Sequence, residues 1–322
     1  LLLYILTDIF KEIPIYVFTG FRESGKTSFI KETMKEGQFS DGQKTVYIMC
    51  EEGTEELNEK EMQDNGFVMH TFENEEDVTY ENFMKIDLAE KPDRVIIEVN
   101  GTWDVNTVIE AFPEHWMMGE GIATVDASTY EQYLANMKQM MTRQFTYADL
   151  IVFNRCRSSQ DLAMYKRTAR AVNRRAQVMF EMEDGSINND VREELPYDMG
   201  LPVIEIGDDD FGIFYLDAFD NMENYLGKTV KFKGVVYKPK HGRADVFVPG
   251  RFAMTCCAAD IQFVGFPCKW EKASDLKEKS FVMVTAKIGK AMSREYGKEA
   301  PVLYAESVEK AEPAKEEVVY FQ

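Results

Sequence analysis

Short apolar runs alternate with polar or amphipathic stretches along the chain until about residue 227. Val, Ile and Phe dominate these runs, which predicts buried β-strands, and the stretches between them have helical spacing. Strands that alternate with helices indicate an α/β domain with a mostly parallel sheet covered by helices. The expected strands are residues 13–18, 44–50, 67–72, 94–101, 121–126, 148–154 and 201–206, and the expected helices are residues 28–34, a stretch ending near 64, 82–91, 129–142 and 159–175.

After residue 227 the period changes from helical spacing to alternation. Strand-like runs follow one another without a long helix between them, which suits a small all-β barrel of OB type. The runs are residues 230–237, 251–256, 261–266, 281–288 and 302–308, and residues 309–317 are expected to be a solvated tail. We therefore expect two domains, an α/β domain at 1–222 and an OB-like barrel at 223–322.

The most informative stretch joins the first strand to the first helix. Residues 20–27 read Gly-Phe-Arg-Glu-Ser-Gly-Lys-Thr, which matches G-x-x-x-x-G-K-[ST] at every position. Glycines let backbone N–H groups turn toward phosphates, and the helix N-terminus adds unpaired donors. Lys26 supplies a cation for the β- and γ-phosphates, and the Thr27 hydroxyl can bind Mg²⁺. The pattern predicts a phosphate-binding loop.

Two later strands end in residues that suit the same site. The run at 94–101 carries Glu98 at its carboxyl end, as a Walker B element does, and such an acid can hold Mg²⁺. The run at 148–154 ends in Asn154, followed by Arg155, Cys156 and Arg157, where a GTPase has Asn-Lys-x-Asp. Because Arg157 replaces the carboxylate that accepts from guanine, selectivity for GTP over ATP is expected to be weakened or re-made by another acid, with Asp161 nearby.

Charge and cysteine content narrow the class of protein. The 322-residue chain has 56 acidic and 37 basic residues and a net charge of −19, which opposes binding to nucleic acid or an anionic membrane. Its 5 cysteines, an odd number, indicate reduced thiols rather than disulfides. The apolar start at residues 1–6 is cut short by Asp8 and lacks a preceding cationic region. We expect a cytoplasmic protein without membrane insertion.

With these motifs in place, residues 13 to about 206 resemble the CobW/HypB/UreG family of P-loop GTPases, closest to the CobW branch. The resemblance rests on residues 18–27, on Cys-Glu-Glu-Gly at 50–53 where the family has Asn-Glu-x-Gly, and on residues 97–101, 125–127 and 148–154. It implies that nucleotide hydrolysis is coupled to delivery of a metal, or a metal-dependent cofactor, to a client protein. It also implies that Glu52 lies near the γ-phosphate.

The family resemblance leaves the metal site open. The CobW branch has Asn-Gly-Cys-x-Cys-Cys-Thr, whereas residues 65–71 read Asn-Gly-Phe-Val-Met-His-Thr and lack all three thiolates. Met69 and His70 are candidate leftover ligands, although an alternating strand explains the same residues. Residues 227–321 resemble a second family, the soluble carboxyl-terminal domain of YcgQ-type permease-associated proteins, on the motif at 254–260 and the segment at 305–309.

Three of the thiols lie in the predicted barrel, which makes it a second candidate for soft-metal binding. They are Cys256, Cys257 and Cys268, with Asp260 and His241 nearby in the sequence. Thiolate-rich sites favour Zn²⁺ or Cu⁺. Adjacent strand residues point to opposite faces, however, and free cysteines often serve as small core residues, so packing is the competing interpretation.

The leading functional prediction is a Mg²⁺-dependent P-loop NTPase, with GTP as its substrate and ATP as the open alternative, that is slow without a partner and acts as a metallochaperone or metal-dependent assembly factor. The alternative is a nucleotide-gated binding module with little turnover, whose barrel engages a permease or another protein. A small-molecule kinase would need an acceptor site that the sequence does not indicate. The predicted catalytic residues are Lys26, Glu52 and Glu98, the nucleotide ligands are Gly20, Arg22, Glu23, Ser24, Gly25, Lys26, Thr27, Ser28, Asn154 and Arg155, the Mg²⁺ ligands are Thr27, Glu52 and Glu98, and the soft-metal candidates, with Zn²⁺ in mind, are Cys256, Cys257 and Cys268.

Overall fold

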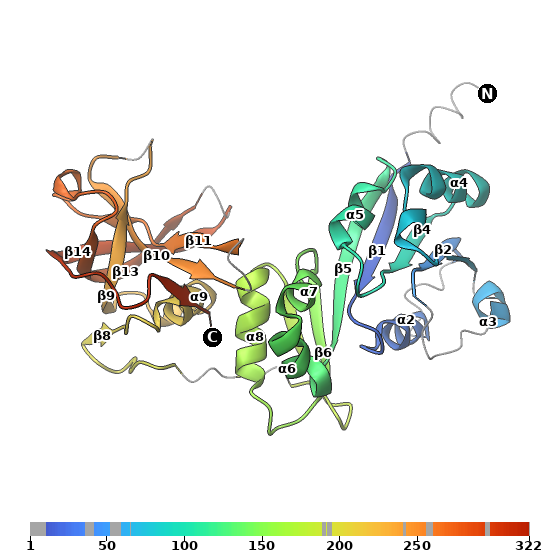
Figure 1. Ribbon diagram of the computed structural model, residues 1–322, viewed down its shortest axis with the longest axis horizontal. Coiled ribbons are helices and arrows are strands. Elements are labelled where there is room, and N and C mark those ends of the chain that lie inside the picture. The colour runs from blue at the N-terminus through green and yellow to red at the C-terminus, as the bar shows by residue number, and fades with distance from the viewer. Residues whose placement is uncertain are drawn as a thin grey trace. The chain divides into compact units, whose positions relative to one another are not determined.

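The computed structural model describes residues 11–35, 42–51, 59–64, 66–188, 191, 195–240, 243–255, 260–293 and 297–321. The chain forms two compact units, which are described separately (Figure 1). The first contains Leu1–Leu162 and Val172–Val191, and the second contains Ala163–Ala171 and Arg192–Gln322. The boundary expected between residues 222 and 223 stays a prediction. The compact units divide earlier in the chain, because the helix Phe211–Asp220, which precedes that boundary, belongs to the second unit.

A seven-stranded sheet forms the centre of the first unit, in the order β3-β2-β4-β1-β5-β6-β7. Every pairing in this sheet is parallel, which confirms the expected α/β class. Because β1 lies between β4 and β5, the residues at the carboxyl ends of these three strands are neighbours. The strands are β1 (Ile13–Thr19), β2 (Thr45–Met49), β3 (Phe67–Thr71), β4 (Arg94–Glu98), β5 (Trp116–Asp126), β6 (Leu150–Cys156) and β7 (Gln177–Met182).

Helices cover both faces of the sheet because its strands carry apolar side chains on both sides. On one face, Ile15, Val95 and Ile97 cluster with Phe83 and Val108 from two helices. On the other, Phe18, Tyr47 and Ile96 cluster with Ile30 and Met62. The helices are α2 (Lys26–Lys35), α3 (Glu59–Asp64), α4 (Tyr80–Glu90), α5 (Val105–Glu110), α6 (Ala127–Asn136) and α7 (Lys138–Arg143), with a 3-10 turn η1 (Glu75–Asp77).

The second unit is built on an eight-stranded sheet in the order β11-β10-β12-β14-β13-β9-β8 with β15 on β10. An additional antiparallel pairing joins β10 to β9, so the pairings β9–β10–β12–β14–β13–β9 form a closed circuit. The all-β prediction is confirmed, whereas the OB type stays a prediction. The strands are β8 (Val203–Glu205), β9 (Thr229–Tyr237), β10 (Val246–Met254), β11 (Gln262–Gly265), β12 (Cys268–Lys269), β13 (Phe281–Met292), β14 (Glu299–Lys310) and β15 (Val318–Tyr320).

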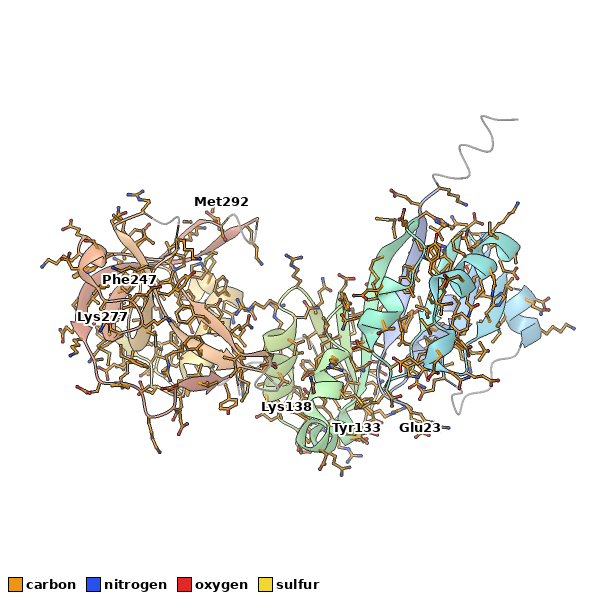
Figure 2. The ribbon with its side chains drawn as sticks, turned by 45° about the horizontal axis from the view of Figure 1, so that its top comes forward. Glu23, Tyr133, Lys138, Phe247, Lys277 and Met292 are labelled. Carbon is orange, nitrogen blue, oxygen red and sulfur yellow. The ribbon has the colours of Figure 1, made fainter. Side chains whose placement is uncertain are left out.

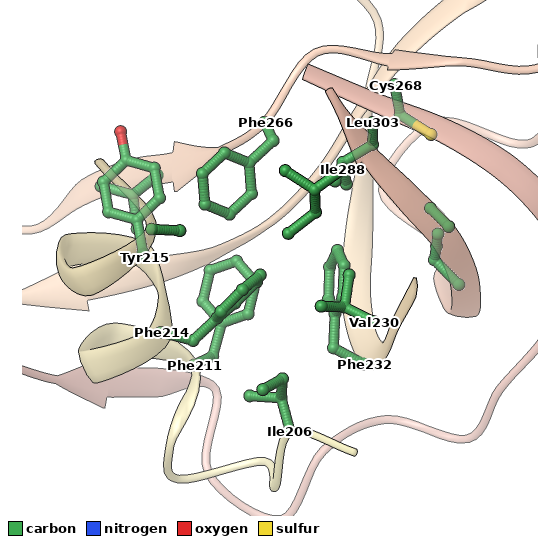
Figure 3. Packing of buried hydrophobic residues seen from close by; sticks show 14 of the residues in the cluster. Ile206, Phe211, Phe214, Tyr215, Val230, Phe232, Phe266, Cys268, Ile288 and Leu303 are labelled. Carbon is green, nitrogen blue, oxygen red and sulfur yellow. The ribbon is translucent and has the colours of Figure 1, made fainter. Parts of the chain in front are cut away.

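An aromatic cluster fills the core of this unit. Phe214 of helix α9 (Phe211–Asp220) contacts Phe232 and Phe266 at ring-centroid distances of 5.8 and 5.3 Å (Figure 3). Phe247 of β10 is fully buried, whereas Lys277 and Met292 are exposed (Figure 2). The unit also contains most of α8 (Leu162–Val172) and the 3-10 turns η2 (Met222–Asn224) and η4 (Ala273–Asp275).

Three expectations differ from the structure. Residues 201–206 were expected in the α/β sheet, but β8 pairs with β9 in the second unit, and the sheet's last strand is β7, which no expected run covers. The expected helix at 129–142 is two helices, α6 and α7, because the chain leaves helical geometry at Met137, where ψ is 39°. The expected solvated tail at 309–317 begins inside β14 and contains the buried Ala314.

Candidate nucleotide-binding site

The predicted phosphate-binding loop connects β1 to α2, as its sequence pattern requires. Gly20 and Gly25 have φ of +137° and +97°, which favours glycine at both positions. A Cβ at Gly20 would lie 2.4 Å from the carbonyl oxygen of Thr124. The loop is thus packed directly against β5, and α2 begins at Lys26, where the helix leaves its first N–H groups unpaired.

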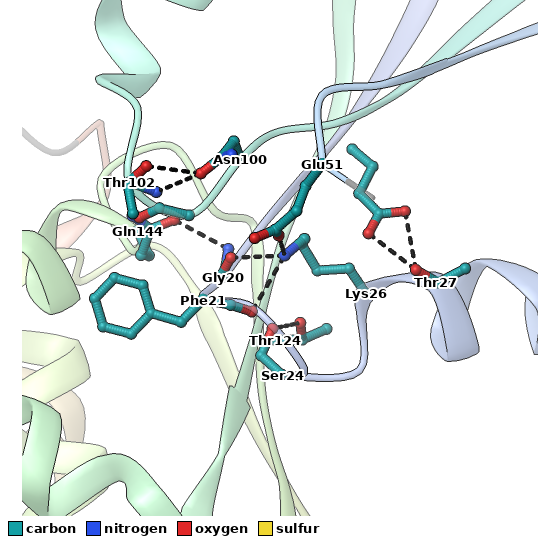
Figure 4. A network of polar contacts seen from close by, with 12 residues as sticks. Gly20, Phe21, Ser24, Lys26, Thr27, Glu51, Asn100, Thr102, Thr124 and Gln144 are labelled. Atoms are coloured by element: carbon teal, nitrogen blue, oxygen red, sulfur yellow. Dashed lines mark hydrogen bonds and ion pairs between the residues drawn. The ribbon is translucent and has the colours of Figure 1, made fainter. Parts of the chain in front are cut away.

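The Lys26 ammonium lies inside this loop and is almost fully buried, with 3% of its surface exposed. It donates to the carbonyl oxygens of Gly20 and Phe21 at 2.8 and 3.1 Å, and to Glu51 Oε2 at 2.9 Å (Figure 4). Each of the three N–H groups of the Lys26 ammonium therefore has an acceptor within the protein. Glu51 follows β2 directly and was not predicted as a site residue, although it belongs to the Cys-Glu-Glu-Gly motif.

Thr27 and Glu98 form the second polar pair of the site. Thr27 Oγ1 donates to Glu98 Oε1 at 2.9 Å, and the Tyr47 hydroxyl donates to Glu98 Oε2. Glu98 is 4% exposed, and Tyr47 is fully buried. Burial, and after it the adjacent Glu98, raises the pKa of the Tyr47 hydroxyl, so tyrosine stays a donor. Hydroxyl and carboxylate oxygens side by side are the ligand set that Mg²⁺ prefers.

Gln144 supports the loop from behind and was not indicated by any sequence motif. Its Oε1 accepts from the Gly20 N–H at 3.0 Å, and its Nε2 donates to the Gly101 carbonyl oxygen at 3.1 Å. A Cβ at Gly101 would lie 2.5 Å from the Gly20 carbonyl oxygen, so these two segments approach closely. A second link is the Ser24–Thr124 hydroxyl pair, 2.8 Å apart. The loop's shape is thus set by neighbours distant in sequence.

The carboxyl end of β6 lies against the same loop. Asn154 Nδ2 donates to the Ser24 carbonyl oxygen at 2.7 Å, and Nη1 of the Arg155 guanidinium donates to the Glu23 carbonyl oxygen at 3.1 Å. The Arg155 guanidinium also pairs with the carboxylate of Asp126, at the end of β5. These contacts bring the predicted pair Asn154 and Arg155 to the predicted phosphate loop.

A cavity of about 290 Å³ lies at the centre of these contacts. It brings together most of the predicted nucleotide and Mg²⁺ ligands, and it adds two acids, Glu51 and Asp126, that were not assigned to the site. Glu52 lies outside the described residues, and Gly20, Ser24 and Asn154 support the wall without lining the cavity. The lining residues are Arg22, Glu23, Gly25, Lys26, Thr27, Ser28, Glu51, Glu98, Asp126 and Arg155.

Comparison with known protein families identifies the family of the chain. The family described as the CobW/HypB/UreG nucleotide-binding domain matches residues 14–180. The chain belongs to this family. Residues 181–321 match the DUF1980 C-terminal domain, which confirms a separate family in the carboxyl-terminal part. No curated protein matches the chain.

Two solved structures are similar to this CobW/HypB/UreG protein. The hydrogenase maturation factor HypB from Archaeoglobus fulgidus has 18% sequence identity and a TM-score of 0.39, and the match covers 52% of this chain and 80% of HypB. A Zn(II)-bound triple mutant of the YjiA GTPase has 15% identity and a TM-score of 0.43, and the match covers 95% of this chain and 92% of YjiA.

The candidate soft-metal ligands of this family member are not gathered in the part of the chain that the structure describes. Cys256, Cys257 and His241 lie outside the described residues. Cys268 is fully buried among apolar side chains, and burial raises the pKa of its thiol to about 12, which opposes the thiolate. His70 Nε2 lies 3.3 Å from Glu90, and Met69 packs against the core. Within the described ranges, no group of three His, Cys, Asp or Glu side chains could hold a metal ion.

Helix length and hydropathy bear on the expected absence of a membrane span. Among the helices of the described residues, none is long and apolar enough to cross a bilayer.

Proposed function

We propose that this protein binds a nucleoside triphosphate, preferring GTP, in the cavity of the first unit and hydrolyses it with Mg²⁺. The observation that carries the proposal is the convergence of Lys26, Thr27 and Glu98 on one cavity beside the glycine-rich loop. These are the cation, the hydroxyl and the carboxylate that phosphoryl transfer requires. The family, whose description is a nucleotide-binding domain, supports the same assignment.

Each residue has a defined part in this proposal. Lys26 exchanges its Glu51 partner for phosphate oxygens and stabilises negative charge on the transferred group. Thr27 and Glu98 would hold Mg²⁺, and Tyr47 donates to one oxygen of Glu98. Bound Mg²⁺ would supply positive charge that offsets the negative charge of the phosphates. Glu52 orients the γ-phosphate or the attacking water, as the family resemblance implies.

We propose slow turnover without a partner protein. The Arg155 guanidinium is engaged by Asp126 and the Glu23 carbonyl oxygen, so it would have to give up these partners to contact the phosphates. Arg22 lines the cavity and is the weak exception. A client that completes the site would therefore accelerate hydrolysis, as added arginines do in other P-loop enzymes.

The role of this cycle rests on the family. CobW/HypB/UreG membership supports delivery of a metal cargo, or metal-dependent assembly, with a protein client. We propose that the closed strand circuit of the second unit is an OB-like barrel that engages the client or a permease. The described residues do not fit a resident soft-metal site, so no step is assigned to zinc or copper.

Phosphate release from GTP and Mg²⁺, with no other acceptor, tests the proposal and separates hydrolysis from a nucleotide-gated module or a kinase. Lys26→Ala should abolish release and weaken triphosphate binding by at least about a hundredfold, because it removes the buried cation of the loop. Lys85→Ala, which changes an exposed lysine of α4, serves as the matched control. Triphosphate binding by Lys26→Ala at wild-type affinity would contradict the site assignment.

A further inference from the structure

The residue that directly follows β6 has a side chain that only donates hydrogen bonds, whereas guanine needs an acceptor there. If the triphosphate binds as proposed, the resemblance to GTPases with Asn-Lys-x-Asp implies that the two donors of guanine, N1–H and the amine at C2, face the position that follows β6. Arg157, which occupies that position, has donors and no acceptor. A carboxylate from elsewhere in the fold is therefore required for guanine selectivity.

Glu183 lies beside Arg157. The Glu183 N–H donates to the Cys156 carbonyl oxygen at 3.0 Å, which continues the pairing of β6 with β7. The Arg157 Nε–H donates to Glu183 Oε1 at 2.6 Å. Their side chains are 52% exposed for Glu183 and 58% for Arg157, so a ligand can reach the carboxylate. Each carboxylate oxygen accepts more than one hydrogen bond, which leaves acceptor capacity beyond the arginine.

A tight turn holds Glu183 at this place. The Gly185 N–H donates to the Met182 carbonyl oxygen at 2.9 Å, and the Met182 N–H donates to the Ser186 carbonyl oxygen at 2.8 Å. Gly185 has φ of +81°, which the turn requires. A residue on such a closed turn loses little further freedom when it binds a ligand.

Two other acids near this edge have partners of their own. Asp126 accepts from Ser128 and pairs with Arg155. Asp184 accepts from the Ser186 N–H at 2.9 Å and closes the turn. Asp161, the candidate indicated by the sequence, directly precedes α8 and is left as an outcome of the test.

Asn154 independently indicates that the β6 end is built for a ligand. Its Oδ1 is buried and has no hydrogen-bond partner among the residues that the structure describes, while its Nδ2 is held by Ser24. A buried acceptor without a partner is costly, and a donor from a bound ligand would remove that cost.

We infer that Glu183 selects the base of the nucleotide, with its carboxylate accepting from guanine N1–H and the C2 amine, and that Arg157 positions this carboxylate. This inference rests on the proposed triphosphate binding. Adenine offers an acceptor at N1 and no amine at C2, so it faces the carboxylate without a donor. Xanthine keeps the N1–H donor but replaces the C2 amine by a carbonyl, so an acceptor faces the second carboxylate oxygen and binding is disfavoured.

Dissociation constants of GTP, ATP and XTP for the full chain test the inference. In the wild type, GTP should bind at least about tenfold more tightly than ATP or XTP, since each of the other two loses or opposes a hydrogen bond to a charged group. Glu183→Gln should weaken GTP and tighten XTP by about tenfold each, because the amide N–H donates to the new carbonyl. Adding Arg157→Asp to Glu183→Gln should restore the preference for GTP.

Glu81→Gln, the same change at an exposed position of α4, is the matched control and should leave all three constants unchanged. An unchanged GTP-to-XTP ratio in Glu183→Gln overturns the inference, and a shift in Asp161→Asn instead assigns selection to that residue. Wild-type protein that binds no triphosphate overturns the proposed function itself. Wild-type protein that binds GTP and ATP equally overturns only the role of Glu183.

Discussion

At the scale of single residues, the contact between Lys26 and Glu51 sets the starting state of the site. The ammonium is buried, and Glu51 supplies its one anionic partner among the described residues. Removing one member of a buried ion pair leaves the other charge without compensation. A phosphate that binds here must therefore displace a carboxylate as well as water.

We predict that Glu51→Gln tightens triphosphate binding by about tenfold, because the competing negative charge is removed while a hydrogen-bonding side chain remains. The same variant should lower the melting temperature of the nucleotide-free protein, since Lys26 loses its counter-charge. Calorimetric titration and thermal unfolding measure the two effects. Glu81→Gln, at an exposed position of α4, is the control. Weaker triphosphate binding in Glu51→Gln would show that Glu51 assists the phosphates rather than competes with them.

Single residues also show how far the candidate site could be predicted from the sequence. The proximity of Lys26 and Thr27 to Glu98 could be predicted, because the motif places the first two at the start of α2 and the strand pattern places Glu98 at the carboxyl end of β4, next to β1. Gln144 and Tyr47 could not, because their roles depend on contacts across 124 and 51 positions of the chain. Nothing local to either residue indicates such a partner.

At the scale of elements, β7 and β8 show the limit of apolar runs as a signal. Only Phe180 is buried among residues 177–182, whereas every residue of the central strand β4 is buried, because β7 is the edge of its sheet. Residues 203–205 resemble a buried strand of an α/β sheet, but they pair with β9, which lies in the second unit. A strand's type can be predicted from its own residues, whereas its sheet depends on the rest of the chain.

The carboxyl-terminal strand β15 gives a second element-scale result. Val319 and Phe321 are buried, and the fully buried Arg251 donates to the Glu316 carbonyl oxygen just before β15. Charge and proline in the preceding residues suggested a solvated tail, yet the backbone there supplies an acceptor to a buried cation. Composition alone does not report such a contact.

We predict that Gly212→Ala destabilises the second unit by several kcal/mol, because a Cβ there would lie 2.0 Å from the Tyr320 carbonyl oxygen. The free energy of unfolding in denaturant measures the effect. In a chain that ends at Glu317 the substitution should cost much less, since β15 is gone. Equal costs in the two backgrounds would show that Gly212 is required for a reason other than contact with β15.

At the scale of the whole molecule, family boundaries and compact units do not coincide. The family match ends at residue 180, but Ala163–Ala171 belongs to the second unit. Arg170 Nε donates to Asp220 Oδ2 at 3.0 Å, and Ala171 is part of the second unit's apolar cluster. A segment of the first family's sequence is thus built into the second unit's structure.

We predict that a fragment of residues 159–322 melts several degrees higher than a fragment of residues 181–322, because only the longer one retains α8 with its ion pair and apolar contact. Thermal unfolding followed by circular dichroism compares them. Arg170→Gln in the longer fragment separates the ion pair from the packing. Identical melting temperatures for the two fragments would contradict a structural role for α8 in this unit.

The position of α8 has a consequence for biosynthesis. Arg170 and Asp220 are 50 residues apart in the chain. At a translation rate of about 5–20 residues per second, the helix emerges roughly 3 to 10 seconds before its partner is made. During that interval α8 lacks the surface it packs on. A pause in translation between the emergence of α8 and that of Asp220 would prolong this state, and a chaperone that recognises amphipathic helices would find its substrate there.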